Sequence, residues 1–425
     1  MIDYAQALQR MLAQMLPLAS ESCALGDAIG RVLAADIVSP MALPSFDHAA
    51  MDGYALDAHE PRAAGSEHEV RGSQAAGDCT RTSSGAATEI MTGARLPADL
   101  DAVIAVERTA LLASHADGSP ARIRLLDSLS SGGNVRHLGA DVARDAVVIV
   151  AGTCIETSHI MLLAALGVAN IEVVRKPRVA IVCTGSELQS DPAQRLADGH
   201  IHNSNGPYLV AALLAAGAEV LSNETVDDTE HHYTRAVERA AAACADLLVS
   251  TGAVSMGRHD FVPGALQQLG AELLFHGVAI RPGRPLLCAR LANRLPILAL
   301  PGTPMAVAVG LRFFIVPALR RMAGQGSEPS WHAMLETPQQ PRPGLRHFLR
   351  ATLHQDIDGR LRATLSGQQQ PFRIRPFADA DAWVVLPEDA GDCVAGTRVE
   401  IVSLDPRVSP PIGTADSSGH RRASS

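Results

Sequence analysis

The chain has 425 residues and a formal net charge of −9, and 47% of its residues are hydrophobic while only 3% are aromatic. This length predicts about three domains, each able to bury a core of its own. The acidic balance and the scarcity of aromatic rings argue against nucleic acid as a partner, because a phosphate backbone needs a basic face and single strands need stacking platforms.

The sequence also indicates the cellular compartment of the protein. No apolar run reaches the roughly 18 residues of a spanning helix, and the N-terminal MIDYAQALQR lacks a secretory signal. The seven cysteines contain no Cys-x-x-Cys pair, so they predict reduced thiols rather than disulfides or a zinc site. We expect a cytoplasmic protein with no membrane partner.

The N-terminal third predicts one helix and then a short, irregular loop. Apolar residues spaced along one face of 2–16 predict a helix that ends at Pro17. The loop LPSFDHAAMDGYAL (43–56) carries Asp47 and Asp52 on either side of an apolar run, and Gly53 permits a turn or a close approach. Alone, this loop is typical of a surface turn whose aspartates bond their own backbone.

The next segments predict a β-rich module and a second helix. Residues 57–135 are rich in Gly, Ser and Thr, with short β-like runs at 102–107 and 121–126. Helical character returns from Ser158, which can cap the first turn, to Gly167, which can end the helix.

An alternation of strands and helices begins after Pro177. Apolar runs at 178–183, 218–222, 246–251 and 295–301 predict strands, and the segments 206–217, 229–245 and 304–322 predict helices. This order predicts a parallel sheet whose binding crevice lies at the carboxyl ends of the strands. Alternating runs within 345–404 predict a small β-barrel or sandwich, and 406–425 predict a disordered tail. The fold class expected is therefore multidomain α/β.

Small and acidic residues follow the predicted strands of this sheet. The segments concerned are Thr184-Gly185-Ser186-Glu187, Asp227-Asp228, Ser250 to Asp260, Arg281 to Pro285, and Pro301 to Pro304. Glycines and hydroxyls allow close approach to phosphate oxygens, and carboxylates beside a phosphate require a cation such as Mg²⁺. Taken singly, each residue also has a structural interpretation: Asp228, Thr229 and Asp260 as helix caps, Pro304 as a helix start, the arginines as partners of surface acids, and His231-His232 as a solvated helix face.

These motifs together resemble a known family. They are PSFDHAAMDGYA (44–55), MTGARLP (91–97), DAVIAVE (101–107), GGNVRHLGADV (132–142), RKPRVAIVCTGSEL (175–188), STGAVSMGRHDF (250–261), IRPGRP (280–285) and LPGTPMA (300–306). From about residue 2 to 404, the chain resembles the MoeA family of molybdopterin molybdenumtransferases, which includes the E domain of gephyrin. The resemblance implies a helical domain from 1–44 and 138–176, an inserted β-rich domain at 45–137, an α/β molybdopterin-binding domain at 177–326 and a C-terminal β-barrel at 327–405. It also implies a homodimer whose site lies between the α/β domain of one subunit and the N-terminal loops of the other.

The resemblance implies a reaction as well. Such enzymes take adenylated molybdopterin and molybdate, split the pyrophosphate link with a divalent ion, and release molybdenum cofactor and AMP. Asp52, Glu187, Asp228 and Asp260 would be the acids that hold Mg²⁺ or orient the substrates, with Asp227 competing for the place of Asp228. The substrate contacts implied are Thr92, Arg136, Asp141, Thr184, Gly185, Ser186, Ser250, Gly252, Ser255, Gly257, Arg281, Arg284, Pro301, Gly302 and Pro304. A molybdopterin adenylyltransferase and molybdoenzymes are the further partners expected.

The chain also departs from the family pattern. Arg281 and Arg284 stand where lysines are usual, His48-Ala49 replaces Asn-Ser, Ala253 a glycine and Thr303 an asparagine. The barrel segment SGQQQPFRIRPFADADAW (366–383) replaces a Ser-Gly segment with later serines, and its Arg373 and Arg375 are candidates to meet a ligand phosphate or a partner. These changes leave two other functions open: a molybdopterin-binding or delivery protein without turnover, and a molybdopterin adenylyltransferase.

Overall fold

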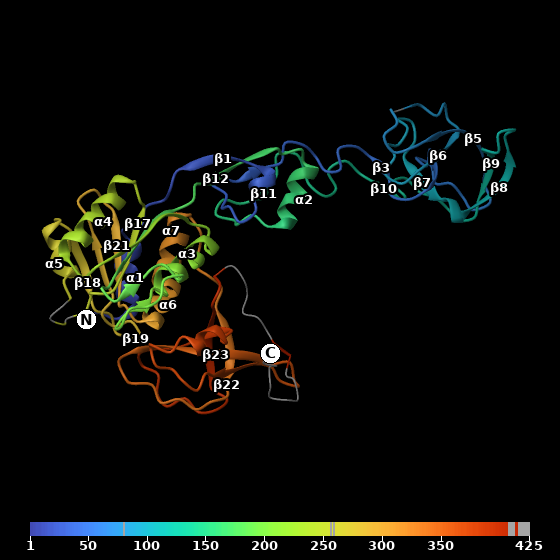
Figure 1. Cartoon of the computed structure of the whole chain (residues 1–425). Helices are drawn as coiled ribbons and strands as arrows, with labels where there is room; N and C mark the ends of the chain where they lie inside the picture. The colour runs from blue at the N-terminus through green and yellow to red at the C-terminus, as the bar shows by residue number, and fades with distance from the viewer. Residues whose placement is uncertain (80, 256, 258–259, 407–412, 415–425) are drawn as a thin grey trace.

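A computed structural model of the chain describes residues 1–79, 81–255, 257, 260–406 and 413–414. The molecule is elongated: a slender segment separates an α/β part and its neighbouring barrel from a β-rich part at the far end (Figure 1). The expected disordered tail at 406–425 lies outside the described residues except for 406 and 413–414. In the part of the chain that is described, no helix is both long and apolar enough to cross a bilayer.

The α/β part is built on one mixed sheet. Its strand order is β16 (Glu219–Val226), β13 (Arg178–Thr184), β17 (Leu247–Thr251), β21 (Pro296–Leu300), β20 (Leu287–Arg290) and β18 (Glu272–His276). The strands from β16 to β21 are parallel, as predicted, whereas β20 runs antiparallel to both of its neighbours, β21 and β18. The four predicted strands are therefore the parallel ones, and the sequence did not predict the two strands at this edge. Residues 291–295 join β20 to β21 and are too few for a parallel crossover, which needs about a dozen residues.

Helices cover both faces of this sheet. They are α1 (Tyr4–Leu12), α3 (Asn205–Ala215), α4 (Glu230–Ala242), α5 (Val262–Gln268), α6 (Pro304–Gly310) and α7 (Val316–Met322), with a π-helical turn at Leu311–Ile315 between the last two. Along β13, Val179 and Ile181 pack with α1, α3 and α7, while Ala180 and Val182 pack with α4 and α5. This alternation with period two gives the sheet two cores.

The two N-terminal helices differ from their predicted bounds. Helix α1 ends at Leu12, well before Pro17, because the N–H groups of Gln14 and Met15 turn back to carbonyls only three residues earlier. Helix α2 (Thr157–Ala165) begins after Glu156 rather than at a Ser158 cap, and the Glu156 N–H donates to His159 Nδ1 at 3.0 Å. Its end at Gly167, with φ +71°, agrees with the prediction.

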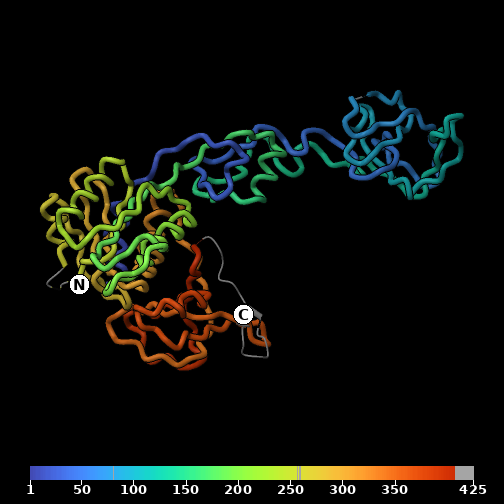
Figure 2. Tube along the Cα trace, viewed as in Figure 1, coloured from blue at the N-terminus to red at the C-terminus, as the bar shows by residue number. Residues whose placement is uncertain are grey.

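The slender segment is made by the chain on its way out and on its way back (Figure 2). β1 (Ser20–Ala24) pairs with β12 (Asn170–Val174), and β2 (Ile37–Val38) pairs with β11 (Val147–Ile149), in both cases antiparallel. A 3₁₀ turn at Leu25–Asp27 and α2 pack beside them.

The β-rich part contains the module predicted from 57–135. Its strand order is β7 (Ala102–Ala105), β4 (Gly53–Leu56), β6 (Ala87–Ile90), β5 (Glu67–Gln74), β9 (Pro120–Leu125) and β8 (Thr109–Ser114), with a 3₁₀ turn at Val106–Arg108. β3 (His48–Ala49) pairs with β10 (Val135–Arg136) where the chain enters and leaves.

The C-terminal part is a closed barrel, which settles the prediction of a barrel or a sandwich. β23 (Arg346–Gln355), β24 (Leu361–Leu365), β22 (Trp331–Leu335), β26 (Arg398–Ser403) and β25 (Ala382–Leu386) follow one another, and β25 pairs back with β23. β19 (Ile280–Arg281) joins β23 and so ties the barrel to the α/β part. The remaining short elements are β14 (Leu188–Gln189), β15 (Ile201–His202), α8 (Arg375–Ala378) and β27 (Gly413–Thr414).

Candidate active site

The carboxyl ends of the parallel strands form one continuous rim. Because β16, β13, β17 and β21 are neighbours and parallel, the loops that follow them emerge on the same edge. Two backbone hydrogen bonds join these loops: Gly185 N donates to Val226 O at 3.1 Å, and Gly252 N donates to Leu300 O at 2.9 Å. The convergence predicted from the sequence is therefore present in the backbone itself.

Glycines allow the loops of this rim to lie very close together. A Cβ on Gly252, whose φ is +95°, would lie 2.5 Å from Thr184 Oγ1 and 2.6 Å from Thr184 O. A Cβ on Gly302 would lie 3.5 Å from Gly252 Cα. The Thr184 hydroxyl donates to Thr251 O at 3.2 Å, so it is held within the rim. Close backbone approach therefore requires a glycine at 252, whereas the contact at Gly302 has an ordinary van der Waals distance.

Asp228 belongs to the same rim and contacts the loop that follows β13. Its Oδ2 accepts a hydrogen bond from Ser186 N at 3.1 Å, and its own N–H donates to Ser186 Oγ at 3.2 Å. Glu187 lies in that loop and is exposed, with its carboxylate folded back toward Gly185. Glu187 and Asp228 are therefore held on adjacent loops of one edge.

Asp227, by contrast, is occupied at the start of α4. Its Oδ1 accepts from Thr229 Oγ1 at 2.8 Å and lies 2.6 Å from His232 Nδ1. These contacts, the Thr229 one first, hold the pKa of Asp227 below its usual value. Thr229 caps the start of α4, as expected from its structural interpretation as a helix cap. The geometry thus separates two neighbouring aspartates that the sequence left equivalent.

Asp260 shapes the loop after β17 and does not cap the helix that follows. Its Oδ2 accepts from Gly257 N at 2.6 Å, whereas α5 begins at Val262 with Phe261 as the preceding residue. The carboxylate also lines the main cavity of the rim.

That cavity, of about 870 Å³, lies between the rim and the barrel. The α/β side is formed by Ser255, Asp260, Arg281, Arg284, Pro301 and Gly302, and the barrel side by Thr337, Gln339, Gln340, His347, Gln369 and Gln370. The sequence indicated the barrel segment 366–383 through Arg373 and Arg375, but neither of these arginines lines the cavity. The other barrel residues were missed, because nothing in their spacing indicates that their loops meet the rim. Pro304 lies at the first position of α6, as predicted for a helix start.

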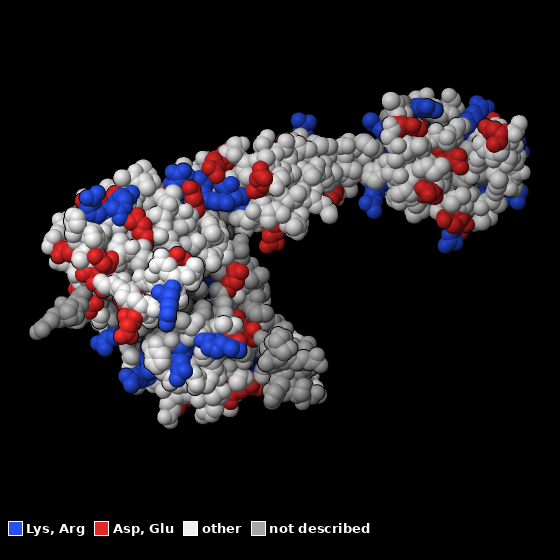
Figure 3. All heavy atoms as spheres, in the orientation of Figure 1, with Lys and Arg blue, Asp and Glu red and all other residues white. Residues whose placement is uncertain are grey.

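Arg281 and Arg284 supply the positive charge of this cavity. Both are exposed, and no ion pair joins either guanidinium to a carboxylate of a described residue, so the interpretation as partners of surface acids finds no support. On the face shown in Figure 3, basic and acidic side chains are interspersed rather than gathered in one basic face. Positive charge at the site is therefore local.

Ser250 differs from the other residues of its motif. It is fully buried, and its hydroxyl lies 3.2 Å from that of Tyr233 between the sheet and α4. The structure places this predicted contact inside a core rather than on the cavity.

Asp52 and Thr92 form a pair in the β-rich part. The N–H and the hydroxyl of Thr92 donate to Asp52 Oδ1 at 2.6 and 2.7 Å, and these two contacts, the N–H first, lower the pKa of Asp52. Gly53 is required beside it, because a Cβ would lie 1.9 Å from Ile104 O. Figure 1 places the β-rich part at the opposite end of the molecule from the rim, so one chain does not bring Asp52 to Glu187.

Other loop residues near Asp52 have structural partners. Asp47 Oδ1 accepts from Leu138 N at 2.6 Å, which agrees with a role in shaping the loop. Arg136 lies on β10 opposite His48, and Asp141 is exposed, with its N–H bonded to Leu43 O at 2.9 Å. Neither Arg136 nor Asp141 lines the rim cavity.

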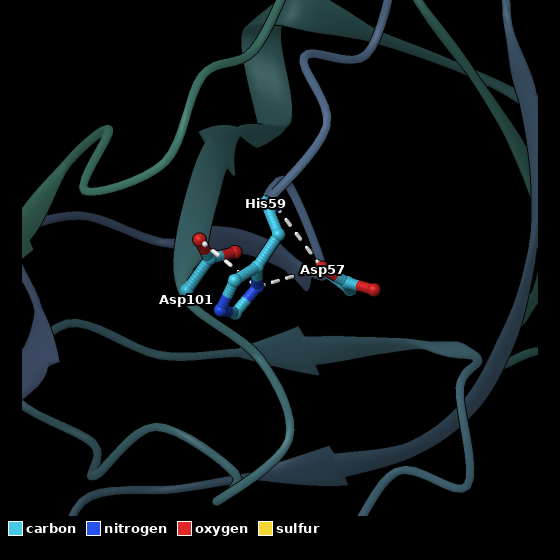
Figure 4. Close-up of side chains that lie close together, drawn as sticks. All are labelled: Asp57, His59 and Asp101. Carbon is cyan, nitrogen blue, oxygen red and sulfur yellow. Dashed lines mark hydrogen bonds and ion pairs between the residues drawn. The ribbon is translucent and has the colours of Figure 1, made fainter.

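A separate cluster in the β-rich part unites Asp57, His59 and Asp101 (Figure 4). His59 Nδ1 lies 3.0 Å from Asp57 Oδ1 and 3.5 Å from Asp101 Oδ2. Asp57 also accepts from His59 N at 3.1 Å, and Asp101 Oδ1 accepts from Ala58 N at 2.6 Å. The cluster therefore closes the turn after β4.

Comparison with known proteins covers nearly the whole chain. Residues 2–167 match the model of the MoeA N-terminal region (domain I and II), 180–321 that of a probable molybdopterin binding domain, and 333–404 that of the MoeA C-terminal region (domain IV). A molybdopterin molybdenumtransferase of Synechococcus elongatus is 32% identical over 95% of this chain and 100% of its own length. One of Bacillus subtilis is 33% identical over 91% and 90%. The crystal structure of a molybdopterin biosynthesis MoeA protein from Pyrococcus horikoshii aligns with a TM-score of 0.79 and 28% identity, over 94% of this chain and 99% of that one.

Proposed function

The chain belongs to the MoeA family, and on that premise we propose that it is a molybdopterin molybdenumtransferase. In the proposed reaction, molybdate is inserted into adenylated molybdopterin and AMP is released. One observation carries the proposal: Gly302, Asp260 and two arginines that pair with no carboxylate of a described residue line a single cavity large enough for a pterin nucleotide. Such a cavity binds anions by close backbone approach and local charge.

The glycines and the arginines of the rim suit different roles in binding the substrate. Gly252 lets the loops of the rim approach closely, since a Cβ there would crowd Thr184, and Gly302 leaves its part of the cavity wall without a side chain. Arg281 and Arg284 offer planar guanidinium groups, which bind tetrahedral oxyanions through two parallel N–H bonds. Catalysis would rest on positioning and charge neutralisation, with no protein nucleophile.

The acids of the rim fit a Mg²⁺ ion that is shared with the substrate. Among the described residues, the group of three ligands near enough to enclose an ion is Asp57, His59 and Asp101, away from the rim. Mg²⁺ is commonly bound by one or two carboxylates together with substrate phosphates, and Glu187 and Asp228 on adjacent loops suit that mode. A bound Mg²⁺ would neutralise charge on the pyrophosphate oxygens.

We propose further that the site is completed by a second copy of the chain. Asp52 is held as a carboxylate by Thr92 but lies far from its own rim, so a homodimer would let it reach the partner's cavity. The slender segment leaves apolar side chains exposed, namely Ile29, Val38, Val147, Val150 and Met161. Near the β-rich part it carries few charges on the face in Figure 3. An apolar surface of this kind suits a permanent interface.

We also propose the four-domain division with the bounds that the family resemblance implies, a cytoplasmic location, and transient contact with a molybdopterin adenylyltransferase and with recipient molybdoenzymes.

Two adjacent aspartates provide a matched test of the proposed function. Purified protein is supplied with adenylated molybdopterin, molybdate and Mg²⁺, and AMP and molybdenum-loaded cofactor are measured. We expect Asp228→Asn to lose most of the turnover and Asp227→Asn to keep it, because Asp227 is occupied by Thr229 and His232. Equal loss in both variants would contradict the assignment of Asp228.

Assays on the wild-type protein distinguish the proposed transferase from the two alternative functions. Tight substrate binding without AMP release would favour a binding or delivery protein. ATP consumption with molybdopterin as substrate would favour an adenylyltransferase.

A further inference from the structure

His347 occupies the wall of the rim cavity on its barrel side. It lies on β23, directly opposite Arg281 of β19 in the parallel ladder, so the two side chains leave the sheet on the same face. Its side chain lines the cavity although the residue is only 4% exposed. A polar ring is thus largely buried beside a guanidinium that pairs with no carboxylate in the part of the chain that is described.

One ring nitrogen of His347 is fixed by the backbone. The N–H of Arg342 donates to His347 Nε2 at 3.0 Å, so Nε2 must carry a lone pair. In the neutral ring the proton then resides on Nδ1. Burial lowers the pKa of His347, and the charges of Arg281 and Arg342 lower it further. The ring is therefore an uncharged imidazole with a defined tautomer.

The other nitrogen is left available. No described residue accepts a hydrogen bond from Nδ1, and the ring faces a cavity whose neighbouring group is the cation of Arg281. Nδ1 does not belong to the fully buried polar atoms that lack a partner among the described residues, so it is open to the cavity and a ligand oxygen there can accept from it.

We propose that His347 donates its Nδ1–H to an oxyanion of the substrate and so determines, together with Arg281, how that oxyanion binds. This inference rests on the proposed function and names a further residue of its site. The ligand chemistry is a tetrahedral oxyanion, supplied either by molybdate or by a phosphate of adenylated molybdopterin. Arg281 supplies charge, and His347 supplies a rigid neutral donor that cannot rotate away, because Nε2 is held by Arg342.

Two substitutions separate the two nitrogens of the ring. The amide nitrogen of asparagine takes the place of Nδ1, so His347→Asn keeps the proposed donor and loses the acceptor for Arg342. The amide of glutamine reaches the place of Nε2, so His347→Gln keeps the acceptor and loses the donor. The apparent KM for molybdate, the apparent KM for adenylated molybdopterin, and kcat are measured for each purified variant, with thermal unfolding as the check on folding.

We expect His347→Gln to raise one of the two KM values by about ten- to a hundredfold, which corresponds to a lost hydrogen bond to a charged group. We expect His347→Asn to keep the same KM value much closer to that of the wild-type protein. A rise confined to molybdate identifies molybdate as the oxyanion, and a rise confined to the nucleotide substrate identifies its phosphate.

The opposite order, with glutamine near wild type and asparagine impaired, would show that the ring serves only to hold Arg342 and would overturn the proposal. Equal KM values in all three proteins, or equal loss in both variants, would overturn it as well. Failure of the proposed function is distinguishable, since the wild-type protein itself would then release no AMP.

Discussion

Replacing Gly252 by alanine should destabilise the α/β part more than the same change at Gly217. Both glycines have a positive φ, +95° and +86°, so an added Cβ strains the backbone at either position by about 1–2 kcal/mol. At Gly217 no atom lies within 4 Å of that Cβ. At Gly252 it would lie 2.5 and 2.6 Å from two oxygens of Thr184, one of them a backbone oxygen of a central strand. Overpacking of this kind adds about 1–3 kcal/mol.

Urea unfolding followed by far-ultraviolet circular dichroism measures the difference, because most of the helices cover the sheet of the α/β part. We expect Gly217→Ala to lower the free energy of unfolding by about 1–2 kcal/mol and Gly252→Ala by roughly 2–5 kcal/mol. Equal losses in the two variants would refute the close approach of the rim loops, and with it the physical reason given for the glycines of this site.

Three other outcomes follow from the contacts described. Substitution Thr92→Val should raise the pKa of Asp52, because one of the two donors that lower it is lost; an unchanged carboxyl chemical-shift titration would contradict this. Replacing the buried Arg350 by methionine removes donors to carbonyls of the 366–373 loop. The backbone amides of that loop should then exchange hydrogen faster, and unaltered protection of these amides would show that other contacts hold the loop. Mixing inactive Asp52→Asn and Glu187→Gln proteins under conditions that exchange subunits should restore part of the activity, since a heterodimer retains one intact composite site, whereas no recovery would count against a shared site.

The alternation of strands and helices after Pro177 was readable from the sequence because each element has a simple local signature. The strand that follows it is apolar on both faces and the helices between strands begin and end at recognisable residues, so β13, α3 and α4 lie within a few residues of their predicted bounds. Strands β18 and β20 were not predicted. The direction of β20 is set by the short connection from 291 to 295, and chain geometry of that kind only becomes evident once the sheet order is known.

The candidate site was predictable in part for a similar reason. Strand-end glycines and acids converge because parallel neighbours place their carboxyl ends on one edge, which the order of elements implies. Asp227 and Asp228 could not be distinguished, since both are aspartates in one turn and only the fold turns one toward His232 and the other toward Ser186. His347 and the glutamines of the barrel were missed because their meeting with the rim depends on the pairing of β19 with β23.

The most direct measurement is the stoichiometry of the reaction in a purified system. Protein, adenylated molybdopterin and molybdate are combined with and without Mg²⁺, and molybdenum bound to the cofactor is counted against AMP released. We predict equal amounts of both products, and neither when Mg²⁺ is removed. AMP release that does not depend on molybdate, or bound molybdenum without AMP, would contradict the proposed transfer.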